Sequence, residues 1–221
     1  MSDTITIVGV IGTDPEKKTW NGTTITTFRV ASKDRRFDRT AKGQKLHMQS
    51  LAALRHFDFN AAGAYAYEQA IETIRLLHLP AYDVEQQFRR AVFNILARNQ
   101  DDHVKNIAFL MNQQGEWRLS PAFDVSYSYN PAGSWTSQHQ MSLNGKRDHF
   151  ELADLVAFGT FCDLKRTIAS EIIGQVHDAV LGWPDRAENA GVPEAMARGI
   201  QAALRLGVCM KSPNARMTGS G

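Results

Sequence analysis

The sequence predicts an α+β fold in which a mostly helical body, residues 36–210, follows a short N-terminal β-hairpin appendage, residues 1–35. Three patterns lead to this prediction. Residues 4–11 alternate threonine and apolar side chains with the period of two that is typical of a half-buried strand. Apolar residues recur at the helical spacing of three to four in several segments after residue 44. Residues 106–124 separate these segments with a strand, a turn and a second strand.

The appendage contains two turn signals between its expected strands. The stretch Gly12-Thr13-Asp14-Pro15 is typical of a turn, and Asn21-Gly22 favours a tight hairpin before a second strand over residues 23–31. Residues 1–43 hold eight Lys/Arg and five Asp/Glu, a net charge of +3, whereas the whole chain has a net charge of +2. A basic arm on a near-neutral body favours an anionic partner.

Helical spacing predicts five helices in the body. Asp83 and Gln86 form a start for the third helix that resembles a capping box, and an apolar stripe on that helix gives the following loop a rigid base. Residues 211–221 have few apolar groups to bury and are expected to be a disordered tail. The predicted helices cover residues 44–56, 67–78, 83–97, 164–181 and 193–206, and a loop is expected over residues 57–63.

The composition is that of a globular protein with one sizeable core. The chain has 221 residues, of which 43% are hydrophobic and 22% are charged. No apolar run approaches the roughly 18 residues of a membrane helix, and no signal segment opens the chain. Cys162 and Cys209 have neither metal-ligand nor redox spacing. We therefore expect two free thiols and a cytoplasmic location.

A polar loop follows the third predicted helix directly. It reads Asp101-Asp102-His103-Val104-Lys105-Asn106, and the strand, turn and strand after it bring Asp124 back towards Asn106. An Asp, an Asn five positions later and a distant Asp are the polar set that phosphoryl transfer from ATP uses. One carboxylate orients the attacking hydroxyl, while the Asn and the second Asp hold magnesium against the phosphates. The same short pattern also fits a helix end decorated with solvated polar residues.

Spacing distinguishes the two adjacent acids. Asp101 lies five residues before Asn106, the interval between Asp and Asn in the catalytic loop of kinases, whereas Asp102 lies four residues before it. We therefore expect Asp101 to orient the substrate hydroxyl and Asp102 to brace the loop, so that Asp102→Ala leaves measurable activity.

Residues 125–149 form a long stretch without periodicity, and such a loop is usually functional or mobile. In a kinase it corresponds to the activation segment and part of the substrate platform. The turn Asn144-Gly145-Lys146 is either a solvated tip or a contact for substrate or phosphate. His139 is expected to be a structural, hydrogen-bonded histidine.

The run FNILARNQDDHVKNIAFLMNQQGEWRLSPAFDVSYSYNP resembles the C-terminal domain of the HipA family, the serine/threonine kinase toxins of bacterial toxin–antitoxin modules. The stretches KLHMQSLAALRHFDFN, YAYEQ and HQMSLNGK extend the resemblance over about residues 36–183. It implies a kinase-like C-lobe, with Asp101 as the catalytic residue, His103 and Lys105 in supporting roles, and Asn106 and Asp124 as ligands of Mg²⁺ and contacts of ATP.

The family resemblance also implies a substrate class and a partner. HipA kinases phosphorylate serine on proteins, notably aminoacyl-tRNA synthetases, and are bound by a HipB-like DNA-binding antitoxin. A HipA kinase normally carries a glycine-rich phosphate loop and an ATP-contacting lysine before this domain, and the sequence has no counterpart of either. A catalytically silent remnant or a partner-binding module therefore stands as the alternative to an active kinase.

The first residues resemble a different family. ITIVGVIGTDPE and TTFRVAS are similar to the start of bacterial single-stranded-DNA-binding proteins, up to about Arg39. The RRFDR run at residues 35–39 fits both families and marks the expected junction. Trp20 could stack on a base with Lys17 and Lys18 (and Arg29) near the phosphates, or it could simply cover a hairpin. Most of a five-stranded OB barrel is missing, so we expect no tight binding of single-stranded DNA.

Overall fold

The computed structural model describes residues 9–11, 16–20, 23–27, 30–32 and 46–209, which belong to two units, residues 1–47 and residues 48–221. In the first unit, β1 (Gly9–Ile11) pairs antiparallel with β4 (Val30–Ser32), and β2 (Glu16–Trp20) pairs antiparallel with β3 (Thr23–Thr27). Lys17, Lys18 and Trp20 lie on β2, where Trp20 is opposite Thr23.

Several sequence predictions fall outside the described residues. They are the start of the first strand (residues 4–8), both turns of the appendage, Arg29, the RRFDR junction at residues 35–39 and the tail over residues 211–221.

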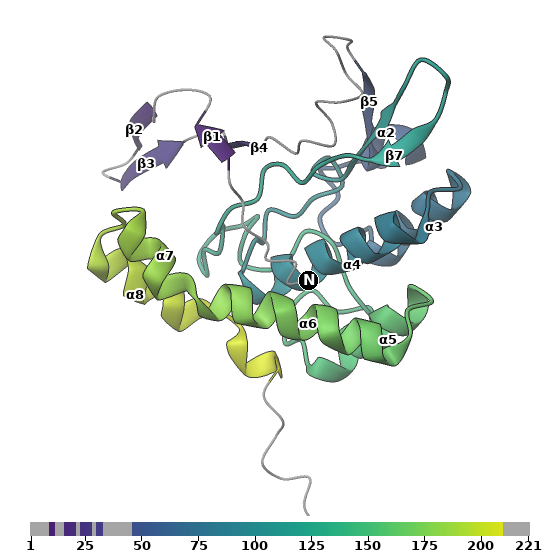
Figure 1. The fold of residues 1–221 in the computed structure, drawn as a ribbon. Coiled ribbons are helices and arrows are strands. Elements are labelled where there is room, and N and C mark those ends of the chain that lie inside the picture. The colour runs from purple at the N-terminus through teal and green to yellow at the C-terminus, as the bar shows by residue number, and fades with distance from the viewer. Residues whose placement is uncertain (1–8, 12–15, 21–22, 28–29, 33–45, 210–221) are drawn as a thin grey trace, which may run out of the picture. The chain divides into compact units, whose positions relative to one another are not determined.

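The second unit combines a three-stranded sheet with a set of packed helices (Figure 1). The strand order of the sheet is β5-β6-β7, and β6 and β7 are antiparallel with Phe109 opposite Leu119. In chain order the elements are β5 (His47–Ser50), α2 (Leu51–Arg55), α3 (Tyr67–Leu76), α4 (Ala81–Leu96), β6 (Ala108–Met111), β7 (Trp117–Leu119), α5 (Leu152–Phe161), α6 (Arg166–Leu181), α7 (Trp183–Asn189), α8 (Glu194–Ala203) and the 3₁₀ helix η1 (Leu206–Cys209).

The helix predicted over residues 44–56 is wrong in its first half. Residues 47–50 form β5, and the helix begins only at Leu51. Ser50 is its N-cap, because its hydroxyl oxygen accepts a hydrogen bond from the backbone N–H of Ala53 (3.2 Å). Pairing of β5 with β6 therefore overrides the local helical spacing that the sequence displays.

The long helix α4 has the buried stripe that its sequence predicts, but a different start. Phe88, Val92, Ile95 and Leu96 are all buried. The N-cap is Pro80 rather than a capping box at Asp83. The buried carboxylate of Asp83 instead accepts a hydrogen bond from the backbone N–H of Leu119 (3.3 Å) in β7, so that its role is to join helix and sheet.

Helix α4 packs against α3, α5 and α6, and Figure 1 shows the sheet and α6 on opposite sides of it. The ring of Phe88 stacks on that of Phe158 in α5 at a centroid distance of 5.7 Å. At Gly159 a Cβ atom would lie 2.8 Å from the Cβ atom of Ala169, so α5 and α6 approach too closely there for a larger residue. This rigid group of helices supports the loop that follows α4.

Two helices were not predicted, α5 and α7. Helix α5 reads LADLVAFGTF, and its apolar residues occupy most of its circumference, so they have no helical period to detect. None of the helices in the described part of the chain is long and apolar enough to cross a membrane.

Candidate active site

The polar loop between α4 and β6 is hydrogen-bonded to the segment that follows Asp124. The backbone N–H of Asp101 donates to Ser128 Oγ (3.0 Å), and the backbone N–H of Ser128 donates to the carbonyl oxygen of Arg98 (3.2 Å). Ser128 Oγ in turn donates to Asn99 Oδ1 (3.2 Å). Ser128 therefore joins the two segments that carry the acids of the predicted site.

Asn106 closes the same loop from its other end. Its Nδ2 donates to the backbone carbonyl oxygen of Asp101 (2.9 Å), and its backbone N–H donates to the carbonyl oxygen of His103 (2.9 Å). The first bond uses the amide nitrogen, so the ligand atom that Asn106 can offer a cation is Oδ1.

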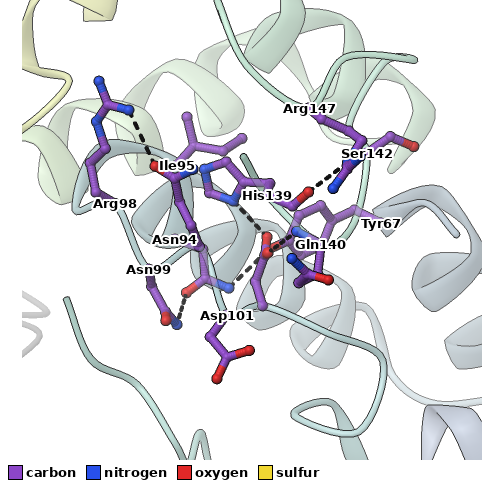
Figure 2. Close-up of polar contacts among 12 residues, drawn as sticks. Tyr67, Asn94, Ile95, Arg98, Asn99, Asp101, His139, Gln140, Ser142 and Arg147 are labelled. Carbon is purple, nitrogen blue, oxygen red and sulfur yellow. Dashed lines mark hydrogen bonds and ion pairs between the residues drawn. The ribbon is translucent and has the colours of Figure 1, made fainter. Parts of the chain in front are cut away.

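Asp101 has a partly exposed carboxylate, with 49% of its side chain accessible. Figure 2 shows this carboxylate pointing away from the buried side chains around His139. Partial burial raises the pKa of Asp101, the charges of Asp124 and Asp102 raise it further, and those of His103 and Lys105 partly offset the effect.

Two side chains at this site offer oxygen atoms of the chemical type that magnesium prefers. The carboxylate of the exposed Asp124 and Oδ1 of Asn106 are hard oxygen ligands of the kind that Mg²⁺ prefers. In the described part of the chain, no group of three or more His, Cys, Asp or Glu residues could hold a metal by itself. Mg²⁺ normally takes one or two carboxylates and completes its shell with water and substrate phosphates, so such a group is not required here.

The two residues predicted to have supporting roles flank Asp101 differently. His103 Nε2 lies 3.8 Å from Asp101 Oδ1, while His103 Nδ1 is buried and has no hydrogen-bond partner among the described residues. Lys105 is exposed, and its Nζ lies 3.4 Å from the centroid of the Phe59 ring, a cation–π contact that holds the ammonium group beside the loop.

Asp102 is buried, with 3% of its surface accessible, and its carboxylate is the centre of a hydrogen-bond cluster. Oδ2 accepts from the hydroxyl of Tyr67 (2.5 Å) and lies 2.7 Å from His139 Nδ1, while Oδ1 accepts from the backbone N–H of Gln140 (2.8 Å). We call these four residues the Asp102 cluster. It fastens the polar loop to α3 and to residues 139–140, which is the bracing role that spacing predicts for Asp102. His139 is the buried structural histidine that the sequence predicts.

A comparison with protein-family models identifies residues 23–183 as a HipA-like C-terminal domain. The chain belongs to this family.

A solved structure supports the same fold for this HipA-like chain. The complex of HipA, HipB and operator DNA from a Shewanella oneidensis MR-1 toxin–antitoxin system matches it with a TM-score of 0.59 and 15% sequence identity. The match covers 87% of this chain and 46% of the other, so this chain spans about half the length of its structural relative. At this identity the likeness shows the fold, a mixture of helices and a small antiparallel sheet.

The other comparisons do not extend the assignment. No curated protein matches the sequence. The resemblance of residues 1–39 to single-stranded-DNA-binding proteins receives no support, and the HipA-like match begins within that segment, at residue 23.

The turn Asn144-Gly145-Lys146 of this HipA-like domain is tied down rather than being a free tip. Asn144 Nδ2 and Lys146 Nζ contact the two carboxylate oxygens of Asp154 (2.9 and 2.7 Å). Asp154 lies in the first turn of α5 and also accepts a hydrogen bond from the backbone N–H of Glu151 (2.8 Å). The ammonium group of Lys146 therefore fastens the turn to α5.

Sequence reasoning missed Tyr67 and Ser128 as parts of the site. Tyr67 was assigned only as the start of a helix, and its hydroxyl meets Asp102 across 35 positions of the chain. Ser128 meets Asp101 across 27 positions. No local pattern reports such contacts, because they depend on how the helices and loops fold together.

Proposed function

We propose that this chain is the C-terminal domain of a HipA-type, ATP-dependent serine/threonine protein kinase, which transfers the γ-phosphate of ATP to a protein serine. The observation that carries the proposal is the placement of Asp101. Its carboxylate is partly exposed on a loop that Ser128 and Asn106 hold by hydrogen bonds, and Ser128 belongs to the segment that follows Asp124.

In the proposed reaction Asp101 accepts a hydrogen bond from the serine hydroxyl and orients it towards the γ-phosphorus. It takes up the hydroxyl proton as the new O–P bond forms and the bond to the departing ADP oxygen breaks. Asn106 Oδ1 and the Asp124 carboxylate are the ligands for Mg²⁺, which when bound neutralises charge on the ATP phosphates. The charges of His103 and Lys105 favour the ionised form of the Asp101 carboxylate.

Exposed aromatic side chains support a protein as the substrate. Phe123, Tyr127 and Trp135 lie on the segment next to Asp124, and each is more than a third accessible. Aromatic residues are enriched at protein–protein interfaces. The family resemblance makes an aminoacyl-tRNA synthetase the first substrate to try, and the HipA–HipB complex makes a HipB-like antitoxin the proposed partner.

The competing function is a binding module without catalysis. It is favoured by the sequence, which contains neither the glycine-rich loop nor the lysine that contact ATP in this family. Heating the protein with and without Mg-ATP separates the two. A ligand present at 100 times its Kd stabilises the folded state by about 2.7 kcal/mol, so we expect Mg-ATP to raise the Tm. An unchanged Tm at millimolar Mg-ATP would favour the binding module.

Asp124→Asn is expected to abolish magnesium-dependent binding of ATP, because it removes the charged ligand of the proposed metal site. Asp124 has a left-handed backbone (φ 53°), a conformation that Asn adopts readily, so the substitution should not strain the chain. We expect the free energy of unfolding to change by less than about 0.5 kcal/mol. Isothermal titration calorimetry with Mg-ATP measures the binding.

Asp163→Asn is the matched control for this experiment. Asp163 is also exposed and also left-handed (φ 59°), but it pairs with Arg75 near the end of α5. This variant should bind Mg-ATP as the parent protein does. Unchanged affinity in Asp124→Asn would remove Asp124 from the metal site.

A further inference from the structure

Arg205 lies between α8 and η1, beyond the residues 23–183 that match the HipA-like family model, yet it is 8% accessible and reaches the Asp102 cluster. Two contacts fix it to the end of α4. Its backbone N–H donates to the carbonyl oxygen of Leu96 (3.0 Å), and its Nη1 donates to the carbonyl oxygen of Ile95 (3.1 Å). Arg205 thus occupies a defined position at the base of the polar loop.

The guanidinium group of Arg205 bridges two further side chains. Nη1 lies 2.7 Å from His139 Nε2, and Nη2 lies 2.5 Å from Asp148 Oδ1. The two protons on Nη1 therefore have two acceptors, the Ile95 carbonyl oxygen and the His139 ring nitrogen. The ion pair with Asp148 holds the guanidinium plane in place, because a bridging arginine has little rotational freedom left.

This contact determines where the proton of His139 resides. An arginine side chain has only donors, so His139 Nε2 must accept and cannot carry a proton. The imidazole is then neutral, with its proton on Nδ1, and Nδ1 donates to Asp102 Oδ2 over 2.7 Å. The opposite tautomer would set a proton on Nε2 against the guanidinium and a lone pair on Nδ1 against the carboxylate.

The other groups around His139 are compatible with this single arrangement. Arg147 Nε donates to the backbone carbonyl oxygen of His139 (2.6 Å), and the ring of Phe150 meets the imidazole edge-on at a centroid distance of 5.4 Å. Tyr67 donates to the same Oδ2 atom of Asp102, and Asn94 Nδ2 donates to the Tyr67 hydroxyl (2.9 Å). These contacts are all compatible with Nδ1 as the donor to Asp102.

We propose that Arg205 is a positioning residue, which fixes the tautomer of His139 and through the Asp102 cluster holds the loop that carries Asp101. The effect on phosphoryl transfer rests on the proposed function, whereas the effects on His139 and on the loop do not. The segment after α8 then helps to position the candidate site, although the family match ends at residue 183.

The tautomer is tested by the ¹⁵N chemical shifts of the His139 imidazole in the full chain at neutral pH, with signals assigned from a His139→Gln variant. We expect a protonated, pyrrole-type Nδ1 and an unprotonated, pyridine-type Nε2 in the parent protein. A protonated Nε2 there overturns the proposal without any Arg205 variant. In Arg205→Met the two shifts should move towards each other, since Nε2 loses the donor that keeps it unprotonated.

Positioning of the loop is tested by hydrogen exchange of two backbone amides, Asp101 (to Ser128 Oγ) and Gln140 (to Asp102 Oδ1). Loss of a charged hydrogen bond changes an equilibrium by about tenfold or more, so both amides should exchange about tenfold faster in Arg205→Met. Arg198→Met is the control, because Arg198 is an exposed arginine of α8 that forms a surface ion pair with Glu194. Equal exchange in the two variants contradicts the positioning role.

A second variant and a measurement of phosphoryl transfer distinguish the role of Arg205 from the proposed kinase function. If Arg205→Met does not fold, Asp148→Asn replaces it, because this variant loosens the guanidinium group without removing it. The same changes in the chemical shifts and in the exchange rates should then appear with smaller amplitude. Their absence counts against the proposal.

Phosphoryl transfer should slow in Arg205→Met and not in Arg198→Met. A parent protein that shows the expected tautomer and exchange but no transfer contradicts the kinase proposal and leaves the role of Arg205 supported.

Discussion

Asp101→Ala is expected to remove phosphoryl transfer almost completely while Mg-ATP still binds. Positioned proton transfer contributes roughly 10²–10⁴-fold to rates, and orientation of the hydroxyl adds to this in phosphoryl transfer, so the rate should fall by at least that factor. The carboxylate is partly exposed and the hydrogen bonds of residue 101 within the loop use its backbone, so the substitution should preserve the loop. Transfer of radiolabel from [γ-³²P]ATP to a protein serine measures the effect.

The control for this experiment is the binding measurement on the same variant. Affinity for Mg-ATP should stay at the parent value, since Asn106 and Asp124 are intact. If the chain by itself transfers no phosphate, the comparison is made on a protein to which the N-terminal lobe of a HipA kinase has been joined. Transfer by Asp101→Ala at the parent rate contradicts the assignment of Asp101.

Asp102→Ala is expected to destabilise the fold strongly, whereas the substitution of its neighbour, Asp101→Ala, should leave the fold intact. Removing one partner from a buried charged network typically costs about 3–5 kcal/mol, because the remaining groups stay buried without partners. Here these are the hydroxyl of Tyr67, the imidazole of His139 and the backbone N–H of Gln140. Urea denaturation of Asp102→Ala and Asp101→Ala measures the contrast, and equal midpoints would contradict it.

The burial of Asp102 changes what is expected of the activity of the Asp102→Ala variant. Position in the sequence predicts that Asp102→Ala keeps measurable activity, since Asp101 is the proposed catalytic residue. Because Asp102 is buried, the variant is expected to be partly unfolded unless stabilising conditions are used. Activity should therefore be assayed at a temperature where circular dichroism shows that the variant is folded.

The stability contributed by the Asp102 cluster should also depend on pH. Burial would raise the pKa of Asp102, but its interaction with His139 and the hydrogen bonds from Tyr67 and Gln140 outweigh burial, so the pKa is lowered. A lowered pKa in the folded state means that the stabilisation is fully present above the unfolded-state pKa, about 3.9, and is lost as the pH falls below it. As the pH is lowered below about 4, the urea midpoint of the parent protein should decrease more steeply than the urea midpoint of Asp102→Asn.

Sequence patterns predicted those elements whose buried residues follow a clear period. The stripe of α4 and most of the extent of α6 are examples, because a single face of each helix meets the core. The start of α2 was wrong, since hydrogen bonds from β5 to a strand some 60 positions later decide that Leu46–Ser50 is not helical. Asp83 was assigned to a cap because its contact with Leu119 in β7 is not visible in the local sequence.

The candidate site was predictable as far as it is local. The interval from Asp101 to Asn106 distinguishes the two acids, and the intervening turn brings both ends of the loop together through a hydrogen bond. The support beneath the loop was not predictable. His139 contacts Asp102 across 37 positions and Arg205 across 66, and neither residue has a neighbour in sequence that indicates its partner.

The different surroundings of Asp101 and Asp102 provide a way to recognise inactive relatives. A lineage that abandons catalysis can replace Asp101 without disturbing the fold, whereas Asp102 must persist for as long as Tyr67, His139 and Gln140 point at it. If the proposed function is correct, a homologue with Asp102 but without Asp101 should therefore fold but transfer no phosphate, and a retained Asp102 reports on the fold alone. This chain carries both residues.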